Sequence, residues 1–151
     1  MPLLVRLYVK TAFAYFLAGF ILMALIALDR WLNISRWLRV VTVSQFHLLV
    51  VGWLSQLAAG VAFWMFPRLR RELHSPGLPG SPRGPEWLAW AVYLCLNIGL
   101  LLRLGAEPFF LMGGPSWLAV LLALSGVLQA AAALLFGWLI WARIRPMEAV
   151  R

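Results

Sequence analysis

The chain alternates between four long apolar runs and shorter segments that carry most of its charges. A transmembrane helix needs roughly 20 consecutive apolar residues, and the runs over residues 11–28, 47–66, 87–104 and 116–142 come near or above that length. Strands are not expected, because the edge of an unclosed sheet cannot be satisfied in lipid. We therefore expect residues 1–151 to form a single transmembrane domain, an all-α integral membrane protein built as a four-transmembrane-helix bundle.

The segments between the runs differ in character. Residues 29–45 place three arginines among tryptophan, leucine and isoleucine, a mixture typical of a short helix lying in the membrane interface. Residues 67–86 contain five of the nine prolines and four arginines, which predicts an irregular, exposed inner loop. Residues 105–115 contain Glu107, Pro108 and the stop Gly113-Gly114-Pro115, and they predict a short turn.

The composition supports a membrane protein. Hydrophobic residues make up 64% of the chain and charged residues only 12%, and a soluble domain of this size cannot hide so much apolar surface. Several of the nine tryptophans stand near the ends of apolar runs, as interfacial aromatics do. The net charge of +8 comes from basic residues in loops and tails. Basic residues in these places indicate the orientation of the chain in the membrane and contact with anionic lipid head groups. No nucleic-acid partner is expected.

The distribution of lysine and arginine predicts the orientation. With the N-terminus inside, nine basic residues are inner and four are outer, which places both termini on the cytoplasmic side. The expected location is the bacterial inner membrane, which the chain crosses several times. The first ten residues lack the features of a cleaved signal peptide. The inner set is Arg6, Lys10, Arg68, Arg70, Arg71, Arg83, Arg143, Arg145 and Arg151, and the outer set is Arg30, Arg36, Arg39 and Arg103.

Two runs contain small residues at helical spacing, which in lipid allows helices to approach closely. Gln56 falls among the small residues of the second run, and we expect its amide to face protein, because an unpaired amide in hydrocarbon is costly. Cys95 is interpreted as a small buried apolar residue. The two sets are Gly52, Gln56, Ala59, Gly60 and Phe63 in the second run, and Gly126, Ala130, Ala133 and Gly137, with Gln129 nearby, in the fourth.

Few residues in the runs carry chemistry. The sequence has no carboxylate pair in the apolar runs, no Ser-His-Asp set and no glycine-rich phosphate loop, so we assign no catalytic residues and expect no enzyme complete in one chain. His74 is interpreted as a solvated loop residue. Two histidines on opposite sides of the membrane cannot make a transition-metal centre, which needs three or more convergent ligands.

His47 is the one residue singled out for a cofactor. It begins the second run, and imidazole is a standard axial ligand to haem iron. At helical spacing, a stripe of apolar residues lies on the same side of the helix as His47. A porphyrin edge could pack against this stripe, and the small Ala58 would leave room for it. The same stripe also describes a lipid-facing helix with a polar residue at the interface. The stripe is Val51, Leu54, Ala58 and Val61.

The stretch QFHLLVVGWLSQLAAGVAFWMFPR, residues 45–68, resembles the second transmembrane helix of the catalytic subunit of haem–copper oxidases. The likeness is greatest to the nitric oxide reductase and cbb3-type branch. Such helices begin with a histidine, carry a small-aromatic step and a second glycine, and end at a proline. His47, Gly52-Trp53, Gly60 and Pro67-Arg68 follow that order. The resemblance implies that His47 ligates a low-spin haem b on the outer side, and that any metal role of His47 is to bind iron in haem.

The chain departs from the family in ways that affect function. Gln45 stands where a His-x-His pair would have its first histidine, and the third and fourth runs lack the family's other haem and metal ligands. Reduction of oxygen or nitric oxide by this chain alone is therefore not expected. In size and character the chain is similar to the small third membrane subunit of Thermus-type nitric oxide reductases.

Three functions remain open from the sequence. The first is a non-catalytic accessory membrane subunit of a respiratory nitric oxide reductase or haem–copper oxidase, packed against the catalytic subunit through its small-residue stripes. The second is a small b-type haem membrane protein, for electron transfer or gas sensing, with His47 as an axial ligand. The other ligand would come from a symmetry mate, a partner chain or a diatomic gas. The third is a transporter or channel subunit, which the lack of charge in the apolar runs disfavours.

Overall fold

A computed structural model describes residues 3–66, 85–141 and 143–144 of the chain. Within these ranges four helices are long and apolar enough to cross a membrane: α1 (Leu3–Leu32), Thr42–Met65, α5 (Glu86–Leu111) and α6 (Trp117–Trp141). The same ranges contain no strand. The predicted all-α fold with four spans is confirmed. The predicted inner loop up to residue 84, with Pro67-Arg68 and His74, falls outside the described residues.

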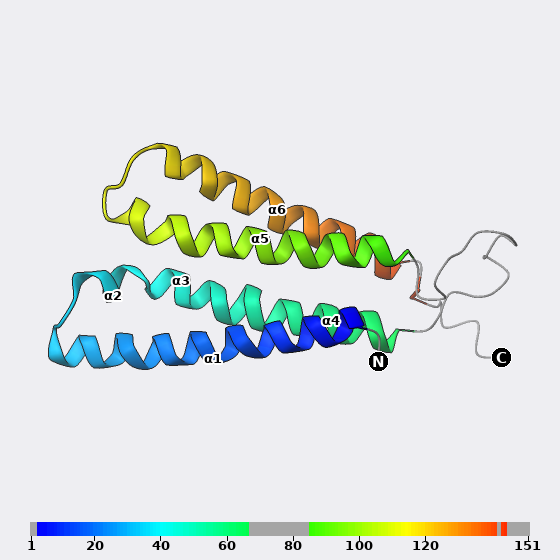
Figure 1. The fold of residues 1–151 in the computed structure, drawn as a ribbon, viewed down its shortest axis with the longest axis horizontal. Helices are drawn as coiled ribbons and strands as arrows, with labels where there is room; N and C mark the ends of the chain where they lie inside the picture. The colour runs from blue at the N-terminus through cyan, green and yellow to red at the C-terminus, as the bar shows by residue number, and fades with distance from the viewer. Residues whose placement is uncertain (1–2, 67–84, 142, 145–151) are drawn as a thin grey trace, which may run out of the picture.

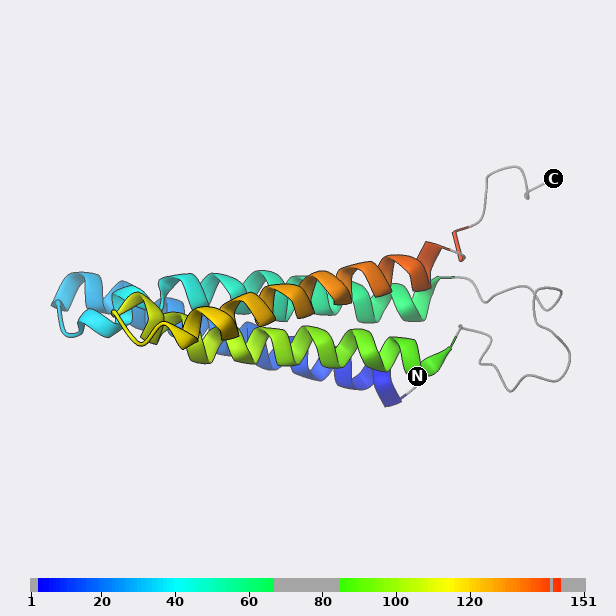
Figure 2. The same cartoon turned by 90° about the horizontal axis from the view of Figure 1, so that it is seen from above.

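The four spans form two antiparallel hairpins that lie side by side (Figure 1). The first consists of α1 and the second span, and the second consists of α5 and α6, so that α1 begins and α6 ends at the same end of an elongated bundle (Figures 1 and 2). Following the predicted orientation, we call this end the inner end and the opposite end the outer end. An even number of spans agrees with termini on one side of a membrane, while the side itself remains a prediction.

The second span is not one uniform helix. It consists of α3 (Thr42–His47), a π-helical segment η1 (Leu48–Ser55) and α4 (Gln56–Met65). The short helix expected between the first two spans is α2 (Arg36–Val40), which starts where Ser35 Oγ accepts a hydrogen bond from the backbone N–H of Trp37 at 3.2 Å. Serine at this position satisfies one of the free donors of a helix start.

The turn predicted over residues 105–115 is wrong in its first part, because α5 continues to Leu111. Arg103 and Glu107 lie one helical turn apart and form an ion pair, which favours helix through this stretch. Pro108 stands in the last turn, where the loss of one backbone donor interrupts little. The chain reverses at Gly113, whose φ of +88° suits glycine.

Close helix contacts in the first hairpin depend on the predicted small residues. A Cβ added at Gly60 would lie 2.6 Å from Tyr8 Cβ, so α4 packs closely on α1 at this point. Gln56 is 1% exposed, and its amide donates to Thr11 Oγ1. The prediction that Gln56 faces protein is confirmed, and Gly52, Ala59, Gly60 and Phe63 are buried with it.

Polar contacts join the two hairpins along their length. On the α1 side, Tyr8 Oη donates to the carbonyl of Ala89 at 3.0 Å, and Tyr15 Oη donates to Asn97 Oδ1 at 2.8 Å. At the inner end, Arg143 Nη2 donates to the carbonyls of Phe63 at 3.1 Å and Phe66 at 2.5 Å.

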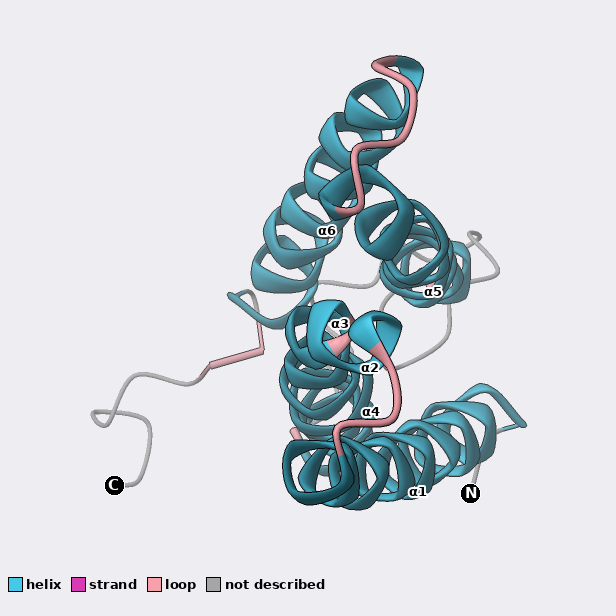
Figure 3. Ribbon diagram, turned by 90° about the vertical axis from the view of Figure 1, so that its left-hand side faces the viewer, coloured by secondary structure: helices cyan, strands magenta, loops and turns pink. Residues whose placement is uncertain are grey.

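An arginine at this place satisfies the free carbonyls at the end of α4. The apolar core around these contacts takes residues from all four spans. Towards the outer end, α6 leans away from the first hairpin (Figures 1 and 3).

Candidate functional site

A polar cluster lies between the hairpins at their outer end. It consists of Ser44 and His47 from α3 and Arg103 and Glu107 from α5, and we call it the outer cluster. Ser44 and His47 are three residues apart, and Arg103 and Glu107 are four apart, so each pair shares one face of its helix. The packing of α3 against α5 brings these two faces together.

Glu107 is the centre of the outer cluster. Its side chain is only 8% exposed. Oε1 lies 3.3 Å from Arg103 Nε, while Oε2 lies 3.3 Å from Ser44 Oγ and 3.6 Å from His47 Nδ1. A buried carboxylate is tolerated only with partners of this kind, so Glu107 ties the two hairpins together at this end. Glu107 was expected in a turn and its role between the hairpins was not predicted, although the Arg103–Glu107 spacing was a usable signal.

The contacts of His47 determine which of its ring nitrogens is free. Nδ1 lies 2.9 Å from the carbonyl oxygen of Val43. A carbonyl oxygen can only accept, so Nδ1 carries the hydrogen and donates, and Nε2 of the neutral ring keeps its lone pair. The carboxylate of Glu107 on the same side of the ring favours this tautomer.

Histidines that bind metals or haem iron are oriented in this way, by a carbonyl or carboxylate at the other nitrogen. The donor chemistry of His47 therefore fits an axial haem ligand. Haem bound there would supply a one-electron redox centre. This chain would supply one ligand from His47, oriented by Val43 and Glu107. The described residues contain no group of three histidine, cysteine or acidic side chains placed to hold a metal ion directly.

The π-helical segment begins directly after His47. π-Helical turns are rare, and they occur frequently at functional sites. The wider turn also changes which residues share a face with His47. Val51 and Ala58 line a groove between the hairpins, whereas Leu54 is 55% exposed. The predicted stripe assumed an uninterrupted α-helix, so its spacing from His47 stays a prediction in this π-helical segment.

A groove of about 430 Å³ lies between the second span, α5 and α6, and we call it the inter-hairpin groove. His47 does not line it. Its outer limit on the second span is Val51, one turn inward of His47. Nearly all of its lining is aliphatic, and its hydrogen-bonding side chains are Ser55 and Gln129. Six representative lining residues are Val51, Ser55, Ala58, Leu96, Gln129 and Phe136.

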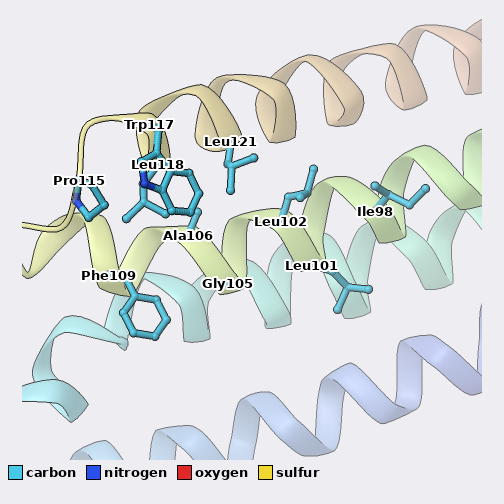
Figure 4. A pocket seen from close by; sticks show the side chains of 10 residues that line it. All are labelled: Ile98, Leu101, Leu102, Gly105, Ala106, Phe109, Pro115, Trp117, Leu118 and Leu121. Carbon is cyan, nitrogen blue, oxygen red and sulfur yellow. The ribbon is translucent and has the colours of Figure 1, made fainter.

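A second hollow of about 600 Å³ lies between the outer ends of α5 and α6 (Figure 4). Trp117, Leu118 and Leu121 of α6 face Leu102 and Ala106 of α5 across it. Its lining has no charged, hydroxyl or amide side chain. This hollow suits an apolar chain and offers no chemical selectivity.

The small residues predicted to pack on the fourth span face outward. Ala130, Ala133 and Gly137 are exposed and Gly126 is half-buried, while α6 packs on α5 through another side that includes Ser125 and Ala132. A Cβ added at Gly126 or Gly137 would meet nothing within 4 Å. Ala119 and Ala123 extend this exposed face towards the outer end. We call Ala119, Ala123, Gly126, Ala130, Ala133 and Gly137 the small-residue face of α6.

Comparisons with family models, curated proteins and solved structures found no match to this chain.

Proposed function

We propose that the chain is a non-catalytic accessory membrane subunit of a respiratory nitric oxide reductase or haem–copper oxidase. The class of complex comes from the resemblance of residues 45–68 to such oxidases. The observation that carries the accessory role is the small-residue face of α6, which is mostly exposed and at which a Cβ added to Gly126 or Gly137 would meet no described residue within 4 Å.

The spacing of that face supports a helix as its partner. Successive residues of this face are separated by four and three positions in turn, from Ala119 to Gly137. This spacing keeps them on one side of a helix. Lipid chains adapt to any side chain, whereas a second helix gains close backbone contact from glycine and alanine. A lengthwise face of small residues is therefore better suited to another transmembrane helix than to lipid.

The non-catalytic part of the proposal depends on composition. The chain has two histidines in all, and the resemblance implies a catalytic subunit that needs several on later helices. Electron and proton chemistry would belong to the partner, and this chain would stabilise or position that partner in the membrane.

Purification in a mild detergent tests this proposal. We expect the native chain to co-elute with an oxidase or reductase subunit, and the double variant Gly126→Leu with Ala130→Leu to lose that subunit while keeping its helical circular dichroism spectrum. Ala24→Leu with Ala27→Leu, on the exposed side of α1, is the matched control and should keep it. A native chain that elutes without any such subunit would contradict the proposal.

A second candidate, a small b-type haem protein, is favoured by the orientation of His47. Its Nδ1 is engaged by Val43 and faces Glu107, which leaves Nε2 to bind iron. Because His47 lies outside the inter-hairpin groove, a porphyrin on Nε2 would also need a surface from a second chain. Two-fold symmetry would let His47 of a second copy supply the other ligand.

The absorption spectrum of the purified protein decides this second candidate. We expect a Soret band that is lost in His47→Ala and kept in His74→Ala, which removes the chain's other histidine. A band that survives His47→Ala would remove His47 from the role, and a protein without a band would remove the candidate.

A further inference from the structure

The inter-hairpin groove lies at mid-depth in the bundle and opens sideways. Ser55 is the last residue of η1, in the middle of the second span, and Gln129 lies midway along α6. Ser55, Ala58 and Ala133 at its mouth are exposed, while Ala59, Val92 and Ala132 at its floor are buried. In a chain that spans a membrane, such a groove is open to the acyl region of the bilayer.

Polar contacts fix the two hairpins to each other at both ends of the bundle, beyond the groove on either side. Glu107 joins α5 to Ser44 at the outer end, and Arg143 joins the end of α6 to the carbonyls of Phe63 and Phe66 at the inner end. Between these points α6 packs on α5 and only slightly on α4. Alanines from α4 and from α6 line the groove on its two sides.

Hydrogen-bonding capacity remains on the wall of the groove. Gln129 Nε2 donates to Ser125 Oγ at 3.3 Å, and Ser125 Oγ donates to the carbonyl of Gly99 at 2.7 Å. The second N–H and the Oε1 of Gln129 have no partner among the described residues. Ser55 Oγ donates to the carbonyl of Val50 at 2.9 Å, and its oxygen can still accept. An amide left partly unpaired in hydrocarbon is costly, and a ligand with a matching polar atom would remove that cost.

We propose that the inter-hairpin groove binds a neutral lipophilic molecule that carries a carbonyl group. The carbonyl oxygen accepts a hydrogen bond from the free Nε2–H of Gln129, and the apolar body lies along Ala58, Leu96 and Phe136. The volume of about 430 Å³ falls in the range of small-molecule sites. No charged side chain lines the groove, so a charged ligand is disfavoured at this depth. This site belongs to one chain and does not depend on the accessory-subunit proposal.

Photolabelling of the full chain in detergent micelles, with 4-decylbenzophenone as the probe, tests the proposal. Two competitors are compared, decyl phenyl ketone and undecylbenzene, which are matched in length and differ in the carbonyl. We expect the ketone to prevent labelling of groove residues at least about tenfold more effectively than the hydrocarbon, the effect of roughly one buried hydrogen bond.

Three variants locate the site. Ala58→Phe fills the groove and should abolish labelling there, whereas Ala24→Phe, on the exposed side of α1, should not. Gln129→Leu keeps the volume and removes the donor, so labelling should persist while the two competitors become equal. Equal competition in the native chain would overturn carbonyl recognition and leave a groove for acyl chains only. Labelling that persists in Ala58→Phe would overturn the site.

Discussion

The contact of Gly60 with Tyr8 gives the most direct test of the packing in the first hairpin. Gly60→Ala adds a single methyl group to α4. That Cβ would lie 2.6 Å from Tyr8 Cβ and 3.2 Å from Tyr8 Cγ, whereas carbon atoms in favourable contact are about 3.5–4.0 Å apart. The atom it meets is close to the α1 backbone, so rotation of the tyrosine ring cannot relieve the overlap, and the two helices must separate by about 1 Å.

The cost of this separation extends beyond the overlap itself. Tyr8 also donates to the carbonyl of Ala89 at 3.0 Å and packs edge-on against Tyr93, with ring centroids 5.0 Å apart. Overpacking of this kind typically costs about 1–3 kcal/mol, and displacing Tyr8 weakens a hydrogen bond worth about 1 kcal/mol. Alanine gains about 1 kcal/mol over glycine in helix propensity. We expect a net loss of about 2 kcal/mol in the free energy of unfolding.

Unfolding in mixed micelles of increasing SDS content, followed by far-UV circular dichroism, measures this loss. Gly137→Ala is the matched control, because its added Cβ meets nothing within 4 Å and only the propensity term remains. We expect the free energy of unfolding of Gly137→Ala to equal that of the native chain or to exceed it by up to about 1 kcal/mol. A Gly60→Ala protein as stable as the Gly137→Ala protein would refute the close contact between α1 and α4.

Further substitutions test the contacts between the hairpins, with the same unfolding assay. Glu107→Ala leaves the buried Ser44 hydroxyl without its acceptor and should cost about 1–3 kcal/mol, and a change within error would show that the outer cluster does not join the hairpins. Tyr8→Phe removes only the bond to Ala89 and should cost about 1 kcal/mol; a larger loss would mean that the ring packing also changes. Arg143→Ala removes a charged donor at the end of α4 and should cost about 1.5–3 kcal/mol, more than Arg30→Ala on the exposed surface.

The sequence predicted the features that depend on composition and small residues. Four apolar runs became four spans, and the burial of Gln56 among small residues was confirmed. These predictions succeed because length and polarity decide what can lie in hydrocarbon. The small residues of the fourth span were also recognised, but a single-chain pattern does not distinguish a face that packs internally from one that faces outward.

The outer cluster could not be predicted in the same way. Ser44 and Glu107 are far apart in the sequence, and their contact depends on the register between the two hairpins. The π-helical segment could not be predicted either, because no residue pattern in it indicates a wider turn. Within the segment, Gly52 lies against Tyr15 and Leu100 of neighbouring helices.

The polar groups of the bundle differ in how many of their hydrogen-bonding atoms have partners within the chain. Tyr8, Gln56 and Glu107 are satisfied by partners within the chain, so their role is explained by holding the helices together. His47 Nε2 and the amide of Gln129 keep capacity that no described residue takes up. Because polar groups in hydrocarbon are expensive unless paired, these two positions are where other molecules would be expected to join the bundle. The two lie on different helices and at different depths, so His47→Ala should leave ketone competition in the groove unchanged, and Gln129→Leu should leave any Soret band unchanged. If either substitution altered the other readout, the outer cluster and the groove would have to be treated as one site.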